Sequence, residues 1–318
     1  MAKVYIPQAV AREGVEYLLE QDYEIIHGNN PTPEEFAREA ADCDAVLIRT
    51  MPCPASLLEA CRKLKIVARH GVGYDNIDTA AAEKLGIWVT NTPQALSDSV
   101  AEYTLAAILT AAKKIPQCSR ALYAGDYFYK NAHKGMDLSG KTLGIVGFGR
   151  IGRALAKKAH FGLDMNILAY SRTLRQEQAP DYVTVCDFDT LLERSDVVTL
   201  HIPGGKENRN LFGPGVFARM KDGAVLVNVA RGEVVDEKAL LQALDQGKLS
   251  FAVLDVQQSE PPKADDPLLK REDVLLTPHM ASNTEECMAR MALHAAWQIH
   301  KVLSGEAPDW PVNHPVLK

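Results

Sequence analysis

The chain has 318 residues, of which 47% are hydrophobic and 24% charged, a balance typical of globular proteins with enough apolar material for two domains. Its formal net charge of −6 argues against nucleic acid or an anionic membrane surface as a partner, because both attract basic proteins. No apolar run is long enough to cross a bilayer, and the first residues lack the pattern of a secretory signal. The six scattered cysteines predict neither a disulfide framework nor a metal site, so we expect a cytoplasmic protein with reduced thiols.

The first hundred residues alternate short apolar strands with helical segments. Strands are predicted at 4–6, 23–26, 45–48, 65–68 and 87–91, and helices at 12–20, 33–41 and 56–62. A strand followed by a crossover helix, repeated along the chain, produces a parallel sheet with helices on both faces.

From residue 98 to 115 the sequence predicts a long helix, with Ser97 or Asp98 as its N-cap, followed by a polar and aromatic connector over 116–140. A second series of strands and helices begins at Lys141. Its strands are predicted at 142–146, 166–170, 196–202, 224–229, 251–255 and 274–277, and its closing helix at 284–303. The predicted fold class is therefore α/β, with two doubly wound parallel-sheet domains.

Three glycines follow the strand at 142–146 with the spacing G-x-G-x-x-G, namely Gly147, Gly149 and Gly152. In dinucleotide-binding proteins the first glycine permits a tight turn, the second lets the backbone approach a pyrophosphate, and the third lets the helix pack on the strand. The helix that begins near Arg150 and Ile151 directs its free N–H groups toward that phosphate. The order of strand, glycine turn, helix and further strand predicts a dinucleotide site. A purely structural glycine-rich turn is the alternative.

The strand at 166–170 is followed by Ser171, Arg172 and Thr173, where a carboxylate would bind the ribose hydroxyls of NAD. An acid at this position repels a 2′-phosphate, whereas Ser171 and Arg172 can hydrogen-bond to one and neutralise it. We therefore expect the cofactor to be NADP or NAD, with NADP favoured. The alternative is that Arg172 is a solvated loop residue.

An arginine, a glutamate and a histidine follow three of the predicted strands, at or just after the carboxyl end of each: Arg231, Glu260 and His279. Open α/β sheets bind ligands along that edge. Each residue also has an ordinary interpretation. Arg231 would then be a surface ion-pair residue, Glu260 a loop acid, and His279 a turn residue that only satisfies a backbone carbonyl.

At these motifs the sequence resembles the D-isomer-specific 2-hydroxyacid dehydrogenases, a family that includes glyoxylate/hydroxypyruvate reductases and D-3-phosphoglycerate dehydrogenases. The resemblance covers nearly the whole chain. It rests on motifs in the family's order, namely 70–78 (HGVGYDNID), 100–102 (VAE), the glycine motif, 201–203 (HIP) and the segments around Arg231, Glu260 and His279. It implies a discontinuous, flavodoxin-like substrate domain of residues 1–98 and 287–318, around an inserted Rossmann cofactor domain of residues 99–286.

The resemblance implies a role for each site residue, and the chemistry of the side chains agrees. His279 would exchange a proton with the substrate oxygen, since an imidazole titrates close to neutral pH. Glu260 would orient that ring, and Arg231 would hold the substrate carboxylate and carbonyl with its planar fork of donors. The backbone N–H groups of Val72 and Gly73 would complete the cradle for the carboxylate.

The same resemblance assigns further residues to the cofactor. Asp255 would meet the nicotinamide carboxamide and Pro203 the adenosine end, and Val229 and Ala230 would also contact the cofactor.

Some residues depart from the family's pattern or have roles that the resemblance does not fix. His201 is equally consistent with a functional role and with a structural role at a strand end. His70 is consistent with a role that only shapes the glycine loop. Glu233 stands where a small or apolar residue is common, so a more acidic pocket rim is expected. Segment 204–208 lacks the usual threonine, which leaves a ribose contact open.

The expected activity is hydride transfer between NAD(P)H and C2 of a small 2-keto or D-2-hydroxy acid, with glyoxylate or hydroxypyruvate as first candidates. D-3-phosphoglycerate dehydrogenase activity is the alternative; it needs basic residues over the pocket, and Arg49 is one. A dinucleotide-sensing scaffold similar to the C-terminal binding protein corepressors is an alternative of another class, because a fold alone does not fix function. The segments 98–115 and 123–129 resemble the family's dimerisation region, which predicts a homodimer.

Overall fold

The computed structural model describes residues 1–316 and falls into two compact units. The first unit consists of Met1–Leu96 with the chain from Ser282 onward, and the inserted unit is Ser97–Ala281. The chain crosses between them at 96/97 and 281/282, whereas the sequence predicted 98/99 and 286/287; residues 317–318 lie outside the described residues. The second crossing comes earlier because Thr284 already caps a helix whose buried face packs in the first unit.

The first unit is built on a parallel sheet with the strand order β2-β1-β3-β4-β5. Its elements are β1 (Lys3–Ile6), α1 (Arg12–Glu20), β2 (Glu24–His27), α2 (Pro33–Ala40), β3 (Ala45–Ile48), α3 (Ala55–Ala60), β4 (Ile66–Arg69), α4 (Thr79–Leu85), β5 (Trp88–Thr90) and α12 (Glu285–Leu303). All side chains of β3 are buried and apolar, because elements cover both faces of the sheet. The predicted flavodoxin-like order is confirmed.

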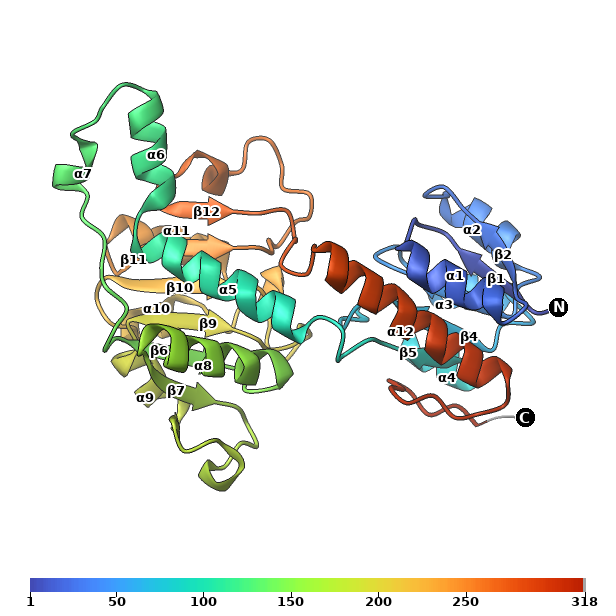
Figure 1. Ribbon diagram of the computed structural model, residues 1–318. Coiled ribbons are helices and arrows are strands. Elements are labelled where there is room, and N and C mark those ends of the chain that lie inside the picture. The colour runs from blue at the N-terminus through green and yellow to red at the C-terminus, as the bar shows by residue number, and fades with distance from the viewer. Residues whose placement is uncertain (317–318) are drawn as a thin grey trace. The chain divides into compact units, whose positions relative to one another are not determined.

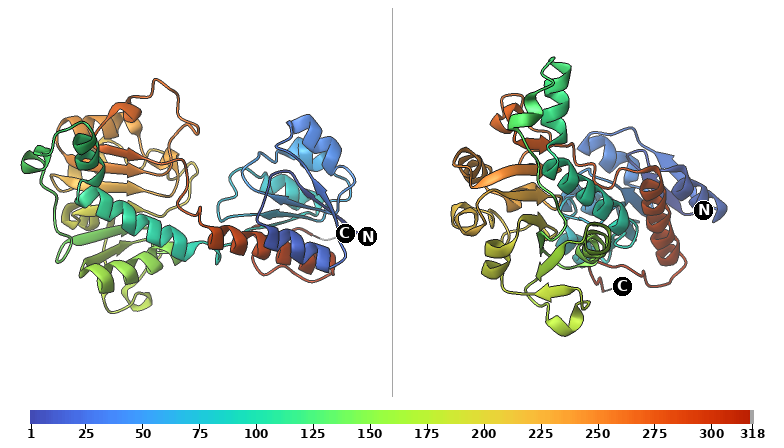
Figure 2. Two further views of the ribbon diagram at one scale, coloured as in Figure 1. Left: turned by 45° about the horizontal axis from the view of Figure 1, so that its top comes forward. Right: turned by 60° about the vertical axis from the view of Figure 1, so that its left-hand side comes forward.

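Helix α12 comes from the far end of the sequence and completes the first unit. It runs beside α1 in Figures 1 and 2, where α12 is red and α1 blue. A Cβ atom on Gly14 of α1 would lie 2.7 Å from the carbonyl oxygen of Ala292, so this glycine lets the two helix backbones approach closely. Ala295, Ala296 and Ile299 of α12 are fully buried against the sheet.

The inserted unit is built on a second parallel sheet, with the order β12-β11-β10-β9-β6-β7-β8. Its elements are α5 (Ser97–Ala112), α6 (Ile115–Tyr123), α7 (Tyr129–Ala132), β6 (Thr142–Val146), α8 (Arg150–Leu163), β7 (Asn166–Tyr170), β8 (Val183–Val185), α9 (Phe188–Arg194), β9 (Val197–Leu200), α10 (Pro214–Arg219), β10 (Ala224–Asn228), α11 (Glu237–Asp245), β11 (Leu249–Leu254) and β12 (Val274–Leu276). This is the order of a Rossmann sheet extended by β12, so the predicted fold class is confirmed for this unit too.

Helices cover both faces of this second sheet (Figures 1 and 2). Buried side chains of α5 and α8 form one core with the sheet, and those of α9, α10 and α11 form another on the opposite face. The strand order reverses between β6 and β9. Open α/β sheets bind ligands at such a reversal, outside the carboxyl ends of the strands, so the loops after these strands are the expected site.

Two parts of the inserted unit differ from the prediction. The long helix ends at Ala112, and the connector expected at 116–140 contains α6 and α7. Lys114 has a left-handed backbone (φ 52°) that separates α5 from α6, and Pro116 then lies in the first turn of α6, where its missing N–H is tolerated. The edge strand β8 was not predicted, because three residues are too few to show a pattern.

Candidate active site

Each glycine of the motif at 147–152 has its own structural reason. Gly147 has a left-handed backbone (φ 98°), and a Cβ atom there would lie 2.4 Å from the carbonyl oxygen of His201. A Cβ atom on Gly152 would lie 2.5 Å from the carbonyl oxygen of Gly147 and would push α8 away from the turn. A Cβ atom on Gly149 would meet no described atom within 4 Å. Among the described residues, no side chain caps the N-terminus of α8. The turn and the helix N-terminus therefore fit a pyrophosphate group.

The end of β7 is joined to this glycine turn by hydrogen bonds. The N–H of Phe148 donates to Ser171 Oγ (2.7 Å), and the N–H of Gly147 donates to the carbonyl oxygen of Tyr170 (2.8 Å). Thr173 follows on the surface. Ser171 thus fixes the β7 end beside the predicted phosphate site, and its own contact with a cofactor stays a prediction.

Arg172 spans from the end of β7 to the loop after β9. Its guanidinium forms an ion pair with Glu207 and donates to Asn208 Oδ1 (2.6 Å). Asn208 is buried and also donates from Nδ2 to the carbonyl oxygen of Pro203 (2.8 Å). Arg172 is 58% exposed but has two partners in the loop after β9, so its guanidinium is not solvated alone.

Glu233 fastens the loop after β9 to the turn that follows β10. One carboxylate oxygen accepts from the N–H of Gly205 (2.6 Å), and the other pairs with Arg209 Nη2 (2.9 Å). The expectation that Glu233 makes the pocket rim more acidic stays a prediction. Both of its oxygens are engaged in holding the loop, which also carries Glu207.

His279 and Glu260 form a hydrogen-bonded pair in the loops after β12 and β11. His279 Nδ1 lies 2.8 Å from Glu260 Oε2, and Glu260 Oε1 accepts from the N–H of Gln257 (3.1 Å). The other ring nitrogen, Nε2, has no hydrogen-bond partner within residues 1–316, and half of the side chain is exposed. The ring is held at one nitrogen and open at the other, as a group that exchanges a proton with a bound molecule requires.

Arg231 lies after the neighbouring strand β10. Its Nη1 donates to the carbonyl oxygen of Ala230 (2.7 Å). Burial raises the pKa of Glu260, but the hydrogen bond and charge of His279, the N–H of Gln257 and the charge of Arg231 outweigh burial and hold that pKa below its usual range. The structure therefore brings Arg231, Glu260 and His279 together at one sheet edge, and their catalytic roles stay predictions.

Asp255 holds the turn that carries His279. Its buried carboxylate accepts from Thr277 Oγ1 (2.7 Å) and from two backbone N–H groups after His279 (2.8 Å each). The carbonyl oxygen of Asp255 accepts from the N–H of His279 (2.8 Å), which has a left-handed backbone (φ 50°). Tyr103 of α5 extends this network through the hydroxyl of Thr277. The geometry gives Asp255 a positioning role, and its contact with a carboxamide stays a prediction.

His201 lies at the carboxyl end of β9 and is partly buried. Burial lowers the pKa of the ring to about 3, so it is neutral. Its Nε2 lies 3.1 Å from Thr199 Oγ1, and its buried Nδ1 has no partner among the described residues. These contacts favour a structural role. Contacts of the nearby Pro203, Val229 and Ala230 with a cofactor stay predictions.

Val72 and Gly73 lie in the first unit, in the loop after β4, and both are partly exposed. The loop is held by Asn91, whose Nδ2 donates to the carbonyl oxygen of Val72 (2.9 Å). The adjacent His70 is buried, and burial is the largest cause that lowers its pKa to about 4. His70 is therefore suited to shaping the loop, and the carboxylate cradle at Val72 and Gly73 stays a prediction.

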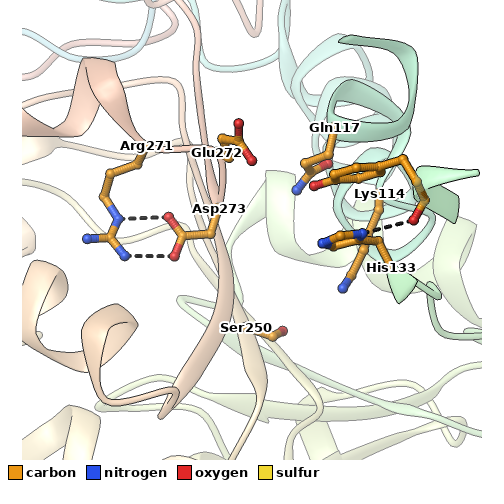
Figure 3. Close-up of a pocket in the computed structure, with 8 residues that line it drawn as sticks. Lys114, Gln117, His133, Ser250, Arg271, Glu272 and Asp273 are labelled. Atoms are coloured by element: carbon orange, nitrogen blue, oxygen red, sulfur yellow. Dashed lines mark hydrogen bonds and ion pairs between the residues drawn. The ribbon is translucent and has the colours of Figure 1, made fainter. Parts of the chain in front are cut away.

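A separate hollow of about 380 Å³ lies at the opposite edge of the second sheet, between α6–α7 and the amino ends of β11 and β12 (Figure 3). Its polar lining consists of Lys114, Gln117, Tyr129, His133, Ser250, Arg271, Glu272 and Asp273. Because the strands are parallel, this edge is the one remote from His279 and the Gly147 turn, so the hollow is not part of the candidate site. Within residues 1–316, no group of three or more His, Cys, Asp or Glu side chains is placed to hold a metal ion.

Three neighbours of the site were missed by the sequence reasoning: Glu207, Asn208 and Gln257. Gln257 binds Glu260 through its backbone N–H, which no side-chain pattern reveals. For Glu207 and Asn208 the sequence signal is partial. An arginine in place of the usual acid after β7 predicts a neutralising partner on a facing loop, but not which residues supply it.

The fold and the site geometry identify the class of protein. The family described as D-isomer specific 2-hydroxyacid dehydrogenase, NAD binding domain, matches residues 105–281, and the chain belongs to the D-isomer-specific 2-hydroxyacid dehydrogenases. The resemblance found in the sequence motifs is confirmed. In the described part of the chain, every helix is too short or too polar to pass through a membrane.

The chain is similar to individual members of this family along nearly its whole length. The chain is 40% identical to a D-3-phosphoglycerate dehydrogenase from Archaeoglobus fulgidus over 99% of its own length, but it spans only 60% of that relative. It is 39% identical to a glyoxylate reductase from Korarchaeum cryptofilum, with 99% of this chain and 97% of the relative covered. A solved structure of a glyoxylate reductase from Paecilomyes thermophila is similar with a TM-score of 0.89 and 30% identity, and 98% of each chain is covered.

Proposed function

We propose that the protein is a cytoplasmic NAD(P)-dependent dehydrogenase that transfers a hydride between the cofactor and C2 of a small 2-keto or D-2-hydroxy acid. The observation that carries this proposal is the His279–Glu260 pair, held at one ring nitrogen and open at the other, on the same sheet edge as Arg231 and the Gly147 turn. Relatives named glyoxylate reductase support glyoxylate or hydroxypyruvate as the substrate. The six cysteines are free thiols, which supports the location.

The protein's part in the reaction follows from these side chains, while a bound nicotinamide supplies or accepts the hydride. His279 Nε2 gives a proton to the substrate oxygen during reduction and takes it back in the reverse direction. Glu260 fixes the orientation of the ring and stabilises its positive charge. Arg231 offers paired N–H donors to the substrate carboxylate. Val72 and Gly73 are the proposed backbone donors of the first unit.

A phosphorylated substrate, 3-phosphohydroxypyruvate, is the second candidate. The relative from Archaeoglobus fulgidus is named D-3-phosphoglycerate dehydrogenase. Arg49 and Arg69 lie at the carboxyl ends of β3 and β4. Burial is the main cause that lowers the pKa of His70, and the charges of these two arginines lower that pKa further. Two guanidinium groups near the loop of Val72 and Gly73 suit a second anionic group on the substrate.

NADP(H) is the proposed cofactor. Ser171 and Arg172 stand at the end of β7 in place of the acid that would bind an unphosphorylated ribose, and no carboxylate of that turn would repel a 2′-phosphate. We expect a higher kcat/KM with NADPH than with NADH. A clear preference for NADH would overturn this part of the proposal.

Initial rates with glyoxylate, hydroxypyruvate and 3-phosphohydroxypyruvate, each with NADH and NADPH, test the proposal. We expect turnover with at least one of the unphosphorylated acids. A higher kcat/KM for the phosphorylated acid, lost in Arg49→Gln, would select the second candidate. If no short 2-keto acid supported cofactor oxidation, the enzyme proposal would fail and a dinucleotide-sensing scaffold would be favoured.

We also propose a homodimer formed through α6 and the segment before α7. Large apolar side chains are exposed there, namely Ile115, Leu122, Tyr123, Tyr127 and Phe128. Such a concentration of exposed apolar surface is typical of a protein interface. Light scattering should give twice the chain mass of 34.9 kDa, and Tyr123→Asp with Phe128→Asp should give monomers. A mass of one chain for the unmodified protein at micromolar concentration would contradict the dimer.

A further inference from the structure

We propose that Glu207 is a specificity-determining residue whose carboxylate competes with the 2′-phosphate of the cofactor for the guanidinium of Arg172, and so limits the preference for NADPH. The inference rests on the proposed function, because it takes the adenosine end of the cofactor to lie beside the end of β7.

Arg172 and Glu207 come from loops on either side of the glycine turn. Arg172 follows β7, Glu207 lies in the loop after β9, and β6, which leads into Gly147, is hydrogen-bonded between those two strands. The ion pair between them therefore crosses the carboxyl end of β6. A dinucleotide whose pyrophosphate lies on the Gly147 turn places its adenosine ribose beside this pair.

The surrounding contacts fix where the two charges meet. Asn208 is only 7% exposed, accepts from Arg172 Nη2 and donates to the carbonyl oxygen of Pro203. Glu233 holds the same loop through the N–H of Gly205. The Nη2 side of the guanidinium is thus occupied by a buried amide. Glu207, bound to Nη1 and 78% exposed, is the partner that an incoming anion can displace.

The competition acts on NADPH and not on NADH. A phosphate monoester carries about −1.5 to −2 charges at neutral pH and pairs strongly with a guanidinium. For it to bind Arg172, Glu207 must either leave, which breaks an ion pair, or stay, which places like charges side by side. Because the pair is largely exposed, water and salt keep either cost small. The ribose hydroxyl of NADH causes neither.

Binding measurements on charge-neutral variants test this inference. Glu207→Gln keeps the size of the side chain and removes its charge. We expect its Kd for NADPH, measured by calorimetric titration, to fall about two- to fivefold, the range for one exposed ion pair, and its Kd for NADH to change less than about 1.5-fold. Arg172→Gln should weaken NADPH binding about tenfold or more, and the gain from Glu207→Gln should vanish in the double variant.

Asp222→Asn is the matched control. It removes the same charge from another exposed ion pair of the inserted unit, with Lys248 (2.7 Å), just before the amino end of β10 and so at the opposite edge of the sheet. Its NADPH affinity should be unchanged.

The outcomes separate this inference from the proposed function. Unchanged NADPH affinity in Glu207→Gln, or an equal gain in Asp222→Asn or on the Arg172→Gln background, would overturn the role of Glu207 and leave the proposed cofactor intact. Unchanged NADPH affinity in Arg172→Gln would overturn the role of Glu207 and the assignment of Arg172 to the 2′-phosphate, because the 2′-phosphate would then bind elsewhere. A preference of the unmodified enzyme for NADH would count against the proposed cofactor alone.

Discussion

The two nitrogens of the His279 ring have different surroundings, and this difference gives the residue its proposed role. Nδ1 is bound to Glu260, and Glu260 is itself held by the backbone of Gln257. Nε2 remains accessible on a half-exposed side chain. Residues linked in this way act as a unit, so the loss of either partner removes most of what the pair contributes.

We predict that His279→Gln lowers kcat about 10²- to 10⁴-fold, the usual contribution of a general acid–base group. The Kd for NADPH should change little, because the proposed pyrophosphate and adenosine sites lie elsewhere on the sheet edge. Glu260→Gln should also lower kcat, and the double variant should lose little more than His279→Gln alone. Steady-state rates and direct cofactor titration measure these effects.

The control for this cycle is Glu237→Gln. The Glu237 carboxylate accepts from the N–H of Gln258 (2.8 Å) in the same loop, whereas the His279 ring is bound to Glu260. A near-normal kcat is expected there. Multiplicative losses in the double variant would show that Glu260 and His279 act independently and would contradict the proposed pair.

The candidate site was predictable at its strand ends and not in its side-chain partners. Arg231, Glu260 and His279 each follow an apolar strand, and parallel strands bring such positions to one edge. The partners of Arg172 depend on the shape of the loop after β9. That shape is set by Glu233 from a different strand end, and no local pattern encodes such a contact.

At the scale of elements, Gly232 lets the turn after β10 touch the loop after β11. A Cβ atom on Gly232 would lie 1.9 Å from the carbonyl oxygen of Gln257, which is backbone and cannot rotate away. One of these segments carries Arg231 and the other Glu260. The close approach therefore sets the spacing of the site.

We predict that Gly232→Ala lowers the free energy of unfolding by about 1–3 kcal/mol, as overpacking does, and lowers kcat because Arg231 and Glu260 are forced apart. Calorimetry and steady-state rates measure both effects. Gly162→Ala is the matched control: it lies in α8, has no described atom within 4 Å of a Cβ, and should raise stability by about 0.5–1 kcal/mol. Unchanged stability and rate in Gly232→Ala would refute the proposed constraint.

The elements themselves were predictable to different degrees. The strands β3, β6 and β7 were placed with the observed bounds, because each is a continuous apolar run between turn residues. Helix α6 was missed because the polar and aromatic composition of 116–140 predicts a connector, whereas Pro116 lies in the first turn of a helix. Whether a helix begins at this point depends on the left-handed backbone of Lys114, which packing of the chain selects.

For the whole molecule, the buried His70 and the partly buried His201 couple stability to pH. Burial, with smaller effects of Arg49 and Arg69, lowers the pKa of His70 to about 4, and burial lowers the pKa of His201 to about 3. His70 belongs to the first unit and His201 to the inserted unit. Between these values and about 6.5, the usual pKa of an unfolded histidine, the folded rings stay neutral while unfolded rings are protonated. The unfolded chain then binds more protons, so stability falls as pH falls.

We predict that the contribution of these rings to the free energy of unfolding is fully present above about pH 6.5. Below that pH it decreases by about 1.4 kcal/mol per pH unit for each ring. Calorimetry at pH 7, 6 and 5 should show this decline. His70→Asn should flatten the pH dependence of the transition of the first unit, and His201→Asn that of the inserted unit. An identical pH dependence in both variants and the unmodified protein would contradict the assignment.

The packing of α12 against α1 also determines when the first unit can finish folding during synthesis. Helix α12 covers Gly14 and the sheet face beneath Ala295 and Ile299, and the ribosome makes this helix only after the whole inserted unit. At about 5–20 residues per second, that interval is on the order of 10–40 s. Throughout it, an apolar face of the nascent chain is uncovered, and the inserted unit, whose residues are contiguous, is complete first. A chaperone that binds nascent apolar surface would therefore be expected to associate with the first unit and to leave when α12 emerges.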